Sequence, residues 1–111
     1  MKEELQRRLA SNENMFRRVN EGIERGQWPD QPDSSIGFRC ECARLGCNTL
    51  LGLTLSRYER VRANPRRFVM LRGHEMPDLE MVVEELDSIV IVEKTGEAGV
   101  AAEAGYPRSA G

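Results

Sequence analysis

The chain has 111 residues and a mass of 12.6 kDa, a size that suits one domain. Its 16 Lys and Arg residues and 18 Asp and Glu residues give a formal net charge of −2, whereas proteins that coat nucleic acids are strongly basic. With 40% hydrophobic and 31% charged residues, the composition also excludes a disordered acidic tail. No apolar run approaches the roughly 18 residues of a membrane span, and the charged N-terminus lacks the apolar region of a secretory signal. We therefore expect a cytoplasmic protein without a membrane segment.

The first predicted element is an amphipathic helix over residues 3–25, in an N-terminal unit that spans residues 1–26. Its seam positions are 4, 3, 4, 3 and 4 residues apart, as in a short coiled coil, and are occupied by Leu5, Leu9, Asn12, Phe16, Val19 and Ile23. Gly26 predicts the end of the helix. Such a seam can associate with a second copy, dock on another protein or lie on its own domain, and these three interpretations stay open.

Residues 27–37 are predicted to be a linker, because prolines, aspartates and serines dominate them. Beyond it we expect an α+β domain over residues 38–98. Strands are predicted near residues 36–40, 49–53 and 68–71, and one short helix, capped by Thr54 or Ser56, ends before Pro65. Residues 80–85 and 88–93 indicate a hairpin, although Pro77 could open a short helix instead. Residues 99–111 form a predicted flexible tail, and the stretch after Thr95 has room for one or two helical turns.

Three cysteines lie close together in the pattern C-x-C-x4-C, at Cys40, Cys42 and Cys47. In an extended segment, residues two apart project to the same side, so the first two sulfurs can point in one direction. Gly46 can adopt a positive φ and return Cys47 to that side. An odd number of cysteines cannot be fully paired in one chain, and three thiolates suit a soft tetrahedral ion such as zinc. The pattern thus favours a small zinc-knuckle domain.

A closed tetrahedral site needs a fourth ligand, and His74 is the single histidine of the chain. It follows an apolar run and Gly73, as expected of a turn after a strand. A Cys3His zinc site would join two distant parts of the chain, where a cross-link stabilises most. If His74 is not a ligand, Glu41, Glu75 or water could take its place. Unliganded thiols, a disulfide and an iron–sulfur cluster are the alternatives to zinc.

Six arginines and one glutamate lie between residues 56 and 72, and seven acidic residues without a base lie between residues 75 and 93. The basic stretch can contact phosphate, nucleic acid or a protein partner, and the candidate contacts are Arg57, Arg60, Arg66 and Arg67. No aromatic residues alternate with these arginines for base stacking, since Tyr58 and Phe68 fit the core better. Pairing between the basic and acidic stretches is therefore the favoured interpretation.

Several motifs together resemble a family of small, uncharacterised actinobacterial proteins built around a cysteine-rich knuckle. They are FRCEC at residues 38–42, Cys47, LT at 53–54, YERVR at 58–62, Pro65, Phe68, GHE at 73–75 and VEKTG with Ala98 at 92–98. The segment FRRVNE at residues 16–21 matches too. The resemblance implies that Cys40, Cys42, Cys47 and His74 act as one unit, and it implies no activity.

The leading interpretation is a zinc-stabilised, non-catalytic protein-interaction or regulatory module. One alternative is a thiol-based redox or metal sensor, in which Arg39 and Arg44 favour reactive thiolates. Nucleic-acid binding through the arginine stretch is another. An enzyme would need an open metal position with Glu41 or Glu75 as general base, and both the H-E-x-x-H motif and the H-x-E…P-C-x-x-C motif of deaminases are absent.

Overall fold

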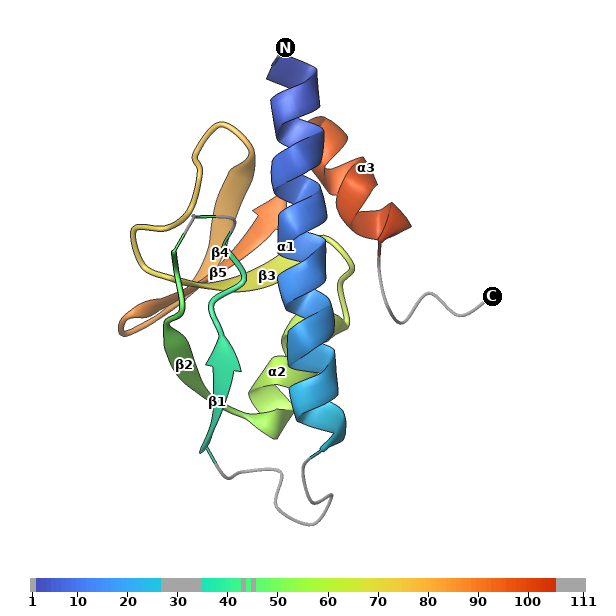
Figure 1. Ribbon diagram of the computed structural model, residues 1–111. Coiled ribbons are helices and arrows are strands. Elements are labelled where there is room, and N and C mark those ends of the chain that lie inside the picture. The colour runs from blue at the N-terminus through green and yellow to red at the C-terminus, as the bar shows by residue number, and fades with distance from the viewer. Residues whose placement is uncertain (1, 27–34, 43, 45, 106–111) are drawn as a thin grey trace.

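The computed structural model describes the backbone of residues 2–26, 35–42, 44 and 46–105, and the side chains of these residues from residue 13 onward. Three helices and five strands follow one another in this part of the chain (Figure 1). In chain order they are α1 (Lys2–Arg25), β1 (Ser35–Arg39), β2 (Leu50–Thr54), α2 (Leu55–Arg62), β3 (Arg67–Leu71), β4 (Glu80–Leu86), β5 (Ile89–Lys94) and α3 (Gly96–Ala104). The predicted α+β class is confirmed.

The strands form two antiparallel sheets. β1 pairs with β2, and the second sheet has the order β3-β5-β4. The chain after β1 connects them, because Cys40 N–H donates to Thr49 O at 2.9 Å while Glu41 N–H donates to Val69 O at 2.8 Å. The segment that carries the first two cysteines therefore lies between the sheets and is hydrogen-bonded to both.

Local sequence signals account for most element boundaries. The hydroxyl of Thr54 accepts a hydrogen bond from Arg57 N–H at 3.1 Å, which confirms the predicted N-cap of α2. β4 and β5 form the predicted hairpin and turn at Asp87, whose φ of 54° is in the left-handed region that short aspartate side chains tolerate. Residues 77–79 form a turn, so the alternative helix after Pro77 is wrong.

The core lies between the two sheets and α2. Phe38 of β1 stacks on Tyr58 of α2 with ring centroids 4.2 Å apart. Both rings are buried, as is Phe68 of β3, so the predicted core positions of Tyr58 and Phe68 are confirmed. The remaining buried apolar residues come mainly from β2, β3 and β5: Leu51, Leu53, Val61, Val69, Met70, Ile89, Val90, Ile91 and Val92.

The predicted N-terminal helix is present, and it packs against β1 and α3 (Figure 1). Its packing side differs from the predicted seam. Glu13, Arg17, Asn20 and Glu21 are buried, whereas Val19 is 43% exposed. Phe16 and Ile23 are half-buried, and Leu5, Leu9 and Asn12 lie outside the residues whose side chains are described. Over residues 13–25 the helix lies on its own domain mainly through a polar face, whose buried charged groups have partners on the domain, and Ile23 of the predicted seam packs against the apolar core.

The strand predicted near residues 36–40 is present as β1, which also includes the last residues of the predicted linker, and residues 27–34 lie outside the described part of the chain. The expectation of one short helix is wrong, because Gly96–Ala104 forms a second one, α3, which packs on α1. The predicted tail thus begins inside a helix, and residues 106–111 lie outside the described residues. Within the described residues, none of the helices has the length and apolarity that crossing a bilayer requires.

Candidate metal centre

Cys40 and Cys42 lie in the extended segment that follows β1. Their side chains are both buried and point to the same side, as alternation along an extended chain requires. The side chain of Glu41 between them points to the opposite side, into a separate polar network. The segment therefore presents two sulfurs on one side and one carboxylate on the other.

The chain then turns to return the third cysteine. Gly46 has a φ of +83°, and Cys47 N–H donates to Arg44 O at 3.2 Å across the turn. The positive φ predicted for Gly46 is confirmed, and a side chain at this position would be strained. Cys47 is half-buried at the edge of the core. All three cysteines are free thiols.

His74 reaches the sulfurs from a turn after β3. Gly73 has a φ of +95°, and His74 N–H donates to Leu71 O at 2.9 Å. The guanidinium of Arg44 donates to Gly73 O at 2.8 Å, so the cysteine loop and the histidine turn are also joined directly. The turns at Gly46 and Gly73 thus bring the three cysteine side chains close to the His74 side chain.

The four candidate ligand atoms lie within 4.8 Å of one another. His74 Nδ1 is 3.8 Å from Cys40 Sγ, 3.3 Å from Cys42 Sγ and 3.6 Å from Cys47 Sγ. A tetrahedral zinc ion with usual bond lengths would hold a sulfur and a nitrogen about 3.6 Å apart. The observed distances scatter around that value, so Cys40, Cys42, Cys47 and His74 form a group that fits a single tetrahedral metal ion.

Hydrogen bonds at the sulfurs favour the thiolate at Cys40. Its pKa is below the usual value of 9.0, first because the Cys42 thiol donates a hydrogen bond to it. Burial acts in the opposite direction. The backbone N–H of Leu71, at 3.2 Å, and that of Cys42 also donate to the sulfur and lower the pKa further. The pKa of Cys42 rises to about 12, first because its proton is held by Cys40 and then because it is buried. The hydrogen bond between the two sulfurs thus lowers one thiol pKa and raises the other, and a divalent cation bound by both sulfurs would displace the proton.

Neither carboxylate that could replace His74 belongs to this cluster. Glu75 Oε1 accepts a hydrogen bond from Gly73 N–H at 2.7 Å. Glu41 faces away from the sulfurs, and its carboxylate is fully used by other donors. Among the described residues, His74 is therefore the one candidate that completes the three cysteines.

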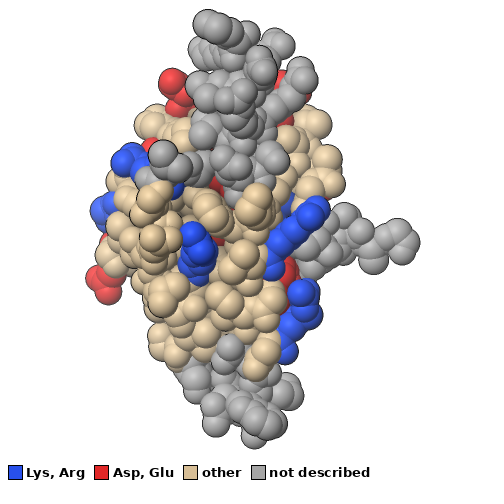
Figure 2. All heavy atoms as spheres, viewed as in Figure 1, with Lys and Arg blue, Asp and Glu red and all other residues tan. Residues whose placement is uncertain are grey.

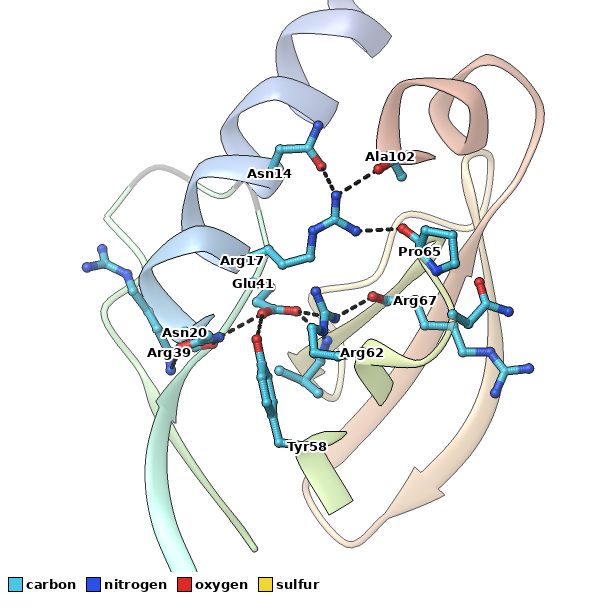
Figure 3. A network of polar contacts seen from close by, with 12 residues as sticks. Asn14, Arg17, Asn20, Arg39, Glu41, Tyr58, Arg62, Pro65, Arg67 and Ala102 are labelled. Carbon is cyan, nitrogen blue, oxygen red and sulfur yellow. Dashed lines mark hydrogen bonds and ion pairs between the residues drawn. The ribbon is translucent and has the colours of Figure 1, made fainter. Parts of the chain in front are cut away.

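The Glu41 carboxylate is at the centre of a buried network that the sequence did not reveal (Figure 3). Oε2 accepts from Asn20 Nδ2 at 2.8 Å and from the Tyr58 hydroxyl at 3.2 Å. Oε1 accepts from the Arg62 guanidinium at 3.1 Å and from Val69 N–H at 2.9 Å. The donors come from α1, α2 and β3, so this carboxylate connects three elements to the cysteine segment.

A second buried ionic cluster lies beside α1. Lys94 of β5 donates to the carboxylates of Glu13 and Glu80, and all three side chains are almost fully buried. Burial raises the pKa of Glu13 well above its usual value of 4.5; Lys94 lowers it and the Glu80 carboxylate adds to the increase. Nothing in the composition marks these residues as buried. For the helix side of the Glu41 network a signal existed, since the segment at residues 16–21 is part of the resemblance and carries Asn20.

The predicted contact arginines are mostly paired within the molecule. On the face shown in Figure 2, the described basic side chains are scattered among uncharged ones and do not gather into a patch. A cavity of about 270 Å³ is lined by Arg57, Arg60 and Arg67, together with Glu84. The ion pairs are Arg57–Glu84, Arg66–Glu103, Arg67–Glu93 and Arg72–Glu85, which leaves Arg60 exposed. Three of these four pairs join the basic stretch to the acidic one, in agreement with the favoured internal matching, and Arg66 pairs with Glu103 beyond it.

No protein-family model matches the chain, and comparisons with curated proteins and with solved structures found no match. The resemblance to an actinobacterial knuckle family therefore has no support from these comparisons. What remains of it is the Cys3His group itself, which the fold brings together. The case for a metal centre depends on that geometry.

Proposed function

We propose that the protein is a zinc-stabilised, non-catalytic interaction or regulatory module, in which Cys40, Cys42, Cys47 and His74 bind one zinc ion. The observation that carries the proposal is the convergence of three sulfurs on His74 Nδ1 at 3.3–3.8 Å. Sulfur and imidazole nitrogen in tetrahedral arrangement are the ligands that structural zinc prefers.

A mononuclear ion fits this group better than an iron–sulfur cluster. Cluster ligands bind different iron atoms and are therefore held farther apart than ligands of one ion, and cysteine fills most of their positions. Here all four ligand atoms lie within 4.8 Å of one another, and one of them is a histidine nitrogen. The spacing supports a single ion.

A structural role follows from the number of ligands. Four protein ligands close a tetrahedral site and leave no position for a substrate or an activated water. The ion would tie the loop after β1 to the turn after β3, and in a chain of 111 residues such a cross-link compensates for a small core. Because thiolate ligands require reduced cysteines, this function suits a reducing compartment such as the cytoplasm.

The interaction part of the proposal is supported by apolar side chains on the outer side of α1. Met15 is 58% exposed and Val19 is 43% exposed, one helical turn apart. Val19 belongs to the predicted seam, so a protein partner or a second copy could pack there. Nucleic-acid binding has less support, since most of the candidate arginines are paired with carboxylates.

Metal analysis of the purified protein tests the zinc site. We expect one zinc per chain in the wild type, and loss of secondary structure by circular dichroism when a strong chelator removes it. Cys47→Ser and His74→Ala should bind zinc at least tenfold more weakly. Glu75→Gln is the matched control, because it changes the residue next to His74 and keeps the acceptor for Gly73 N–H.

Several outcomes would contradict the proposal. A wild-type protein that is stably folded without metal would remove the structural role of zinc. A brown protein after anaerobic purification would indicate an iron–sulfur cluster. Release of zinc by dilute peroxide, together with altered partner binding, would favour the redox sensor, for which half-buried Cys47 is the accessible sulfur.

A further inference from the structure

Asn20 connects α1 directly to the segment that carries two of the candidate metal ligands. Its side-chain amide pairs with the backbone of Arg39 in both directions: Nδ2 donates to Arg39 O at 2.7 Å, and Arg39 N–H donates to Oδ1 at 2.7 Å. The same Nδ2 donates to the Glu41 carboxylate at 2.8 Å (Figure 3). Asn20 is fully buried, so these contacts replace water completely.

The other buried side chains of α1 also make polar contacts, while Ile23 packs against the apolar core. The Arg17 guanidinium donates to Ala102 O at 2.7 Å and to Pro65 O at 2.5 Å, and it lies 4.5 Å from the centre of the Phe68 ring. Glu13 pairs with Lys94. Hydrogen bonds and ion pairs of this kind depend on the position of their acceptors, whereas apolar packing tolerates small shifts. The attachment of α1 is therefore sensitive to the geometry of residues 39–41.

Metal ligation would determine that geometry. Cys40 and Cys42 flank Glu41, and in an extended segment a backbone rotation that moves their sulfurs also moves the carboxylate on the opposite side. With both sulfurs bound to one ion, the Arg39 carbonyl and the Glu41 carboxylate are held where Asn20 meets them. Without the ion, Cys40 and Cys42 are free cysteines that no covalent bond joins, and the segment is less constrained.

We infer that metal binding and docking of α1 are coupled through residues 39–42, so that metal occupancy controls whether the polar face of α1 stays on the domain. The inference depends on the proposed metal site. Coupling between two equilibria is reciprocal: if the metal favours the docked helix, the docked helix favours metal binding by the same factor. Asn20 is thus a positioning residue for the metal site, which it reaches through Arg39 and Glu41 rather than through a ligand side chain.

A zinc competition titration against a chromophoric chelator tests the coupling in the full chain. We expect Asn20→Ala to bind zinc about tenfold more weakly than the wild type, as outer partners of metal ligands commonly do. Val19→Ala is the matched control: it changes the next residue of the same helix, which is 43% exposed, and it should leave the affinity unchanged.

Hydrogen exchange adds a readout that a simple loss of stability would not produce. In Asn20→Ala with saturating zinc, the amides of α1 should exchange at least tenfold faster, whereas those of β3 and β5 keep their protection. A uniform acceleration in all elements would show general destabilisation and would overturn the coupling. If Asn20→Ala does not fold with zinc, Asn20→Ser, whose hydroxyl can keep one contact, is measured instead.

The two proposals fail in different ways. If the wild type binds one zinc and Asn20→Ala binds it with the same affinity, the coupling is wrong and the metal site stands. If the wild type binds no zinc under reducing conditions, both are wrong. Weaker binding in Asn20→Ala with wild-type affinity in Val19→Ala supports both.

Discussion

The two helices α1 and α2 attach to the same sheets by different means. α2 is a single segment of 8 residues, and it buries Tyr58 and Val61 among apolar side chains of the core, together with Arg62, which pairs with Glu41. α1 is three times as long, and over its described side chains the buried ones are Glu13, Arg17, Asn20 and Glu21. The short helix combines apolar burial with an ion pair to Glu41, whereas the described part of the long one is held mainly by directed polar contacts.

This difference indicates which attachment can be regulated. Apolar burial is almost independent of pH and of small shifts in the backbone, so α2 should stay in place as long as the core is intact. Directed contacts between buried charged groups are lost when one partner moves or is removed. Both helices contact Glu41 of the cysteine segment, so changes there should affect both, and α2 should be affected less because Tyr58 and Val61 also hold it in the apolar core.

The largest effect is expected from Lys94→Met. This substitution leaves Glu13 and Glu80 buried without their cation, and removing one member of a buried ionic group costs about 3–5 kcal/mol. Urea unfolding with saturating zinc measures the loss. Arg60→Ala, at an exposed position, is the control and should change the free energy of unfolding by less than about 0.5 kcal/mol. An equal effect of both variants would contradict the importance of the buried cluster.

A smaller loss is expected from Val61→Ala in α2. Val61 is buried in the core, and removing its methyl groups should cost about 2 kcal/mol. Since the contacts of α1 are untouched, the hydrogen-exchange rates of the α1 amides should change by the same factor as those of the β5 amides. Selective loss of protection in α1 would show that the two attachments are not separate.

The pH dependence of stability should differ between the wild type and Glu13→Gln. Burial raises the pKa of Glu13 above 4.5 in the folded state, so above that pH the folded protein keeps a proton that the unfolded chain has released. The free energy of unfolding of the wild type then falls as the pH rises from about 4.5 to the raised pKa. Gln cannot titrate, so the stability of the wild type relative to Glu13→Gln should fall across this range. Urea unfolding at a series of pH values checks this, and parallel curves would contradict it.

The smallest effect is expected from Met15→Ala and Val19→Ala on the outer side of α1. Both side chains are more than 40% exposed, so the free energy of unfolding of the monomer should change by less than about 0.5 kcal/mol. Unfolding measured at several protein concentrations checks this. A loss above about 1 kcal/mol that grows with concentration would show that a second copy covers this side in solution.

Much of the candidate site could be predicted because its determinants are local. Alternation along an extended segment puts Cys40 and Cys42 on one side, and the glycines at positions 46 and 73 permit the turns that return Cys47 and His74. The N-cap at Thr54 and the β4–β5 hairpin depend on neighbouring residues in the same way. Such features depend on residues that are close in the sequence, and the fold then brings the cysteine segment and the histidine turn together.

The packing of α1 could not be predicted in this way. The seam spacing favoured an apolar side for the helix, yet charged residues face the domain because Lys94, Pro65 and Ala102, all distant in the sequence, supply their partners. Arg62 lies within the basic stretch of the sequence, yet it is buried, because Glu41 and the carbonyl of Arg67 accept hydrogen bonds from it there.

Residue order alone was enough to establish the α+β class, the cysteine and histidine set and most strand and helix limits, because each depends on contacts within a few positions. Only the folded structure decided which side of α1 is buried. It also decided the network around Glu41, the cluster of Glu13, Glu80 and Lys94, and the pairing of the arginines. A charged side chain is stable in the interior only when partners from other elements surround it, and no local pattern records which elements those are.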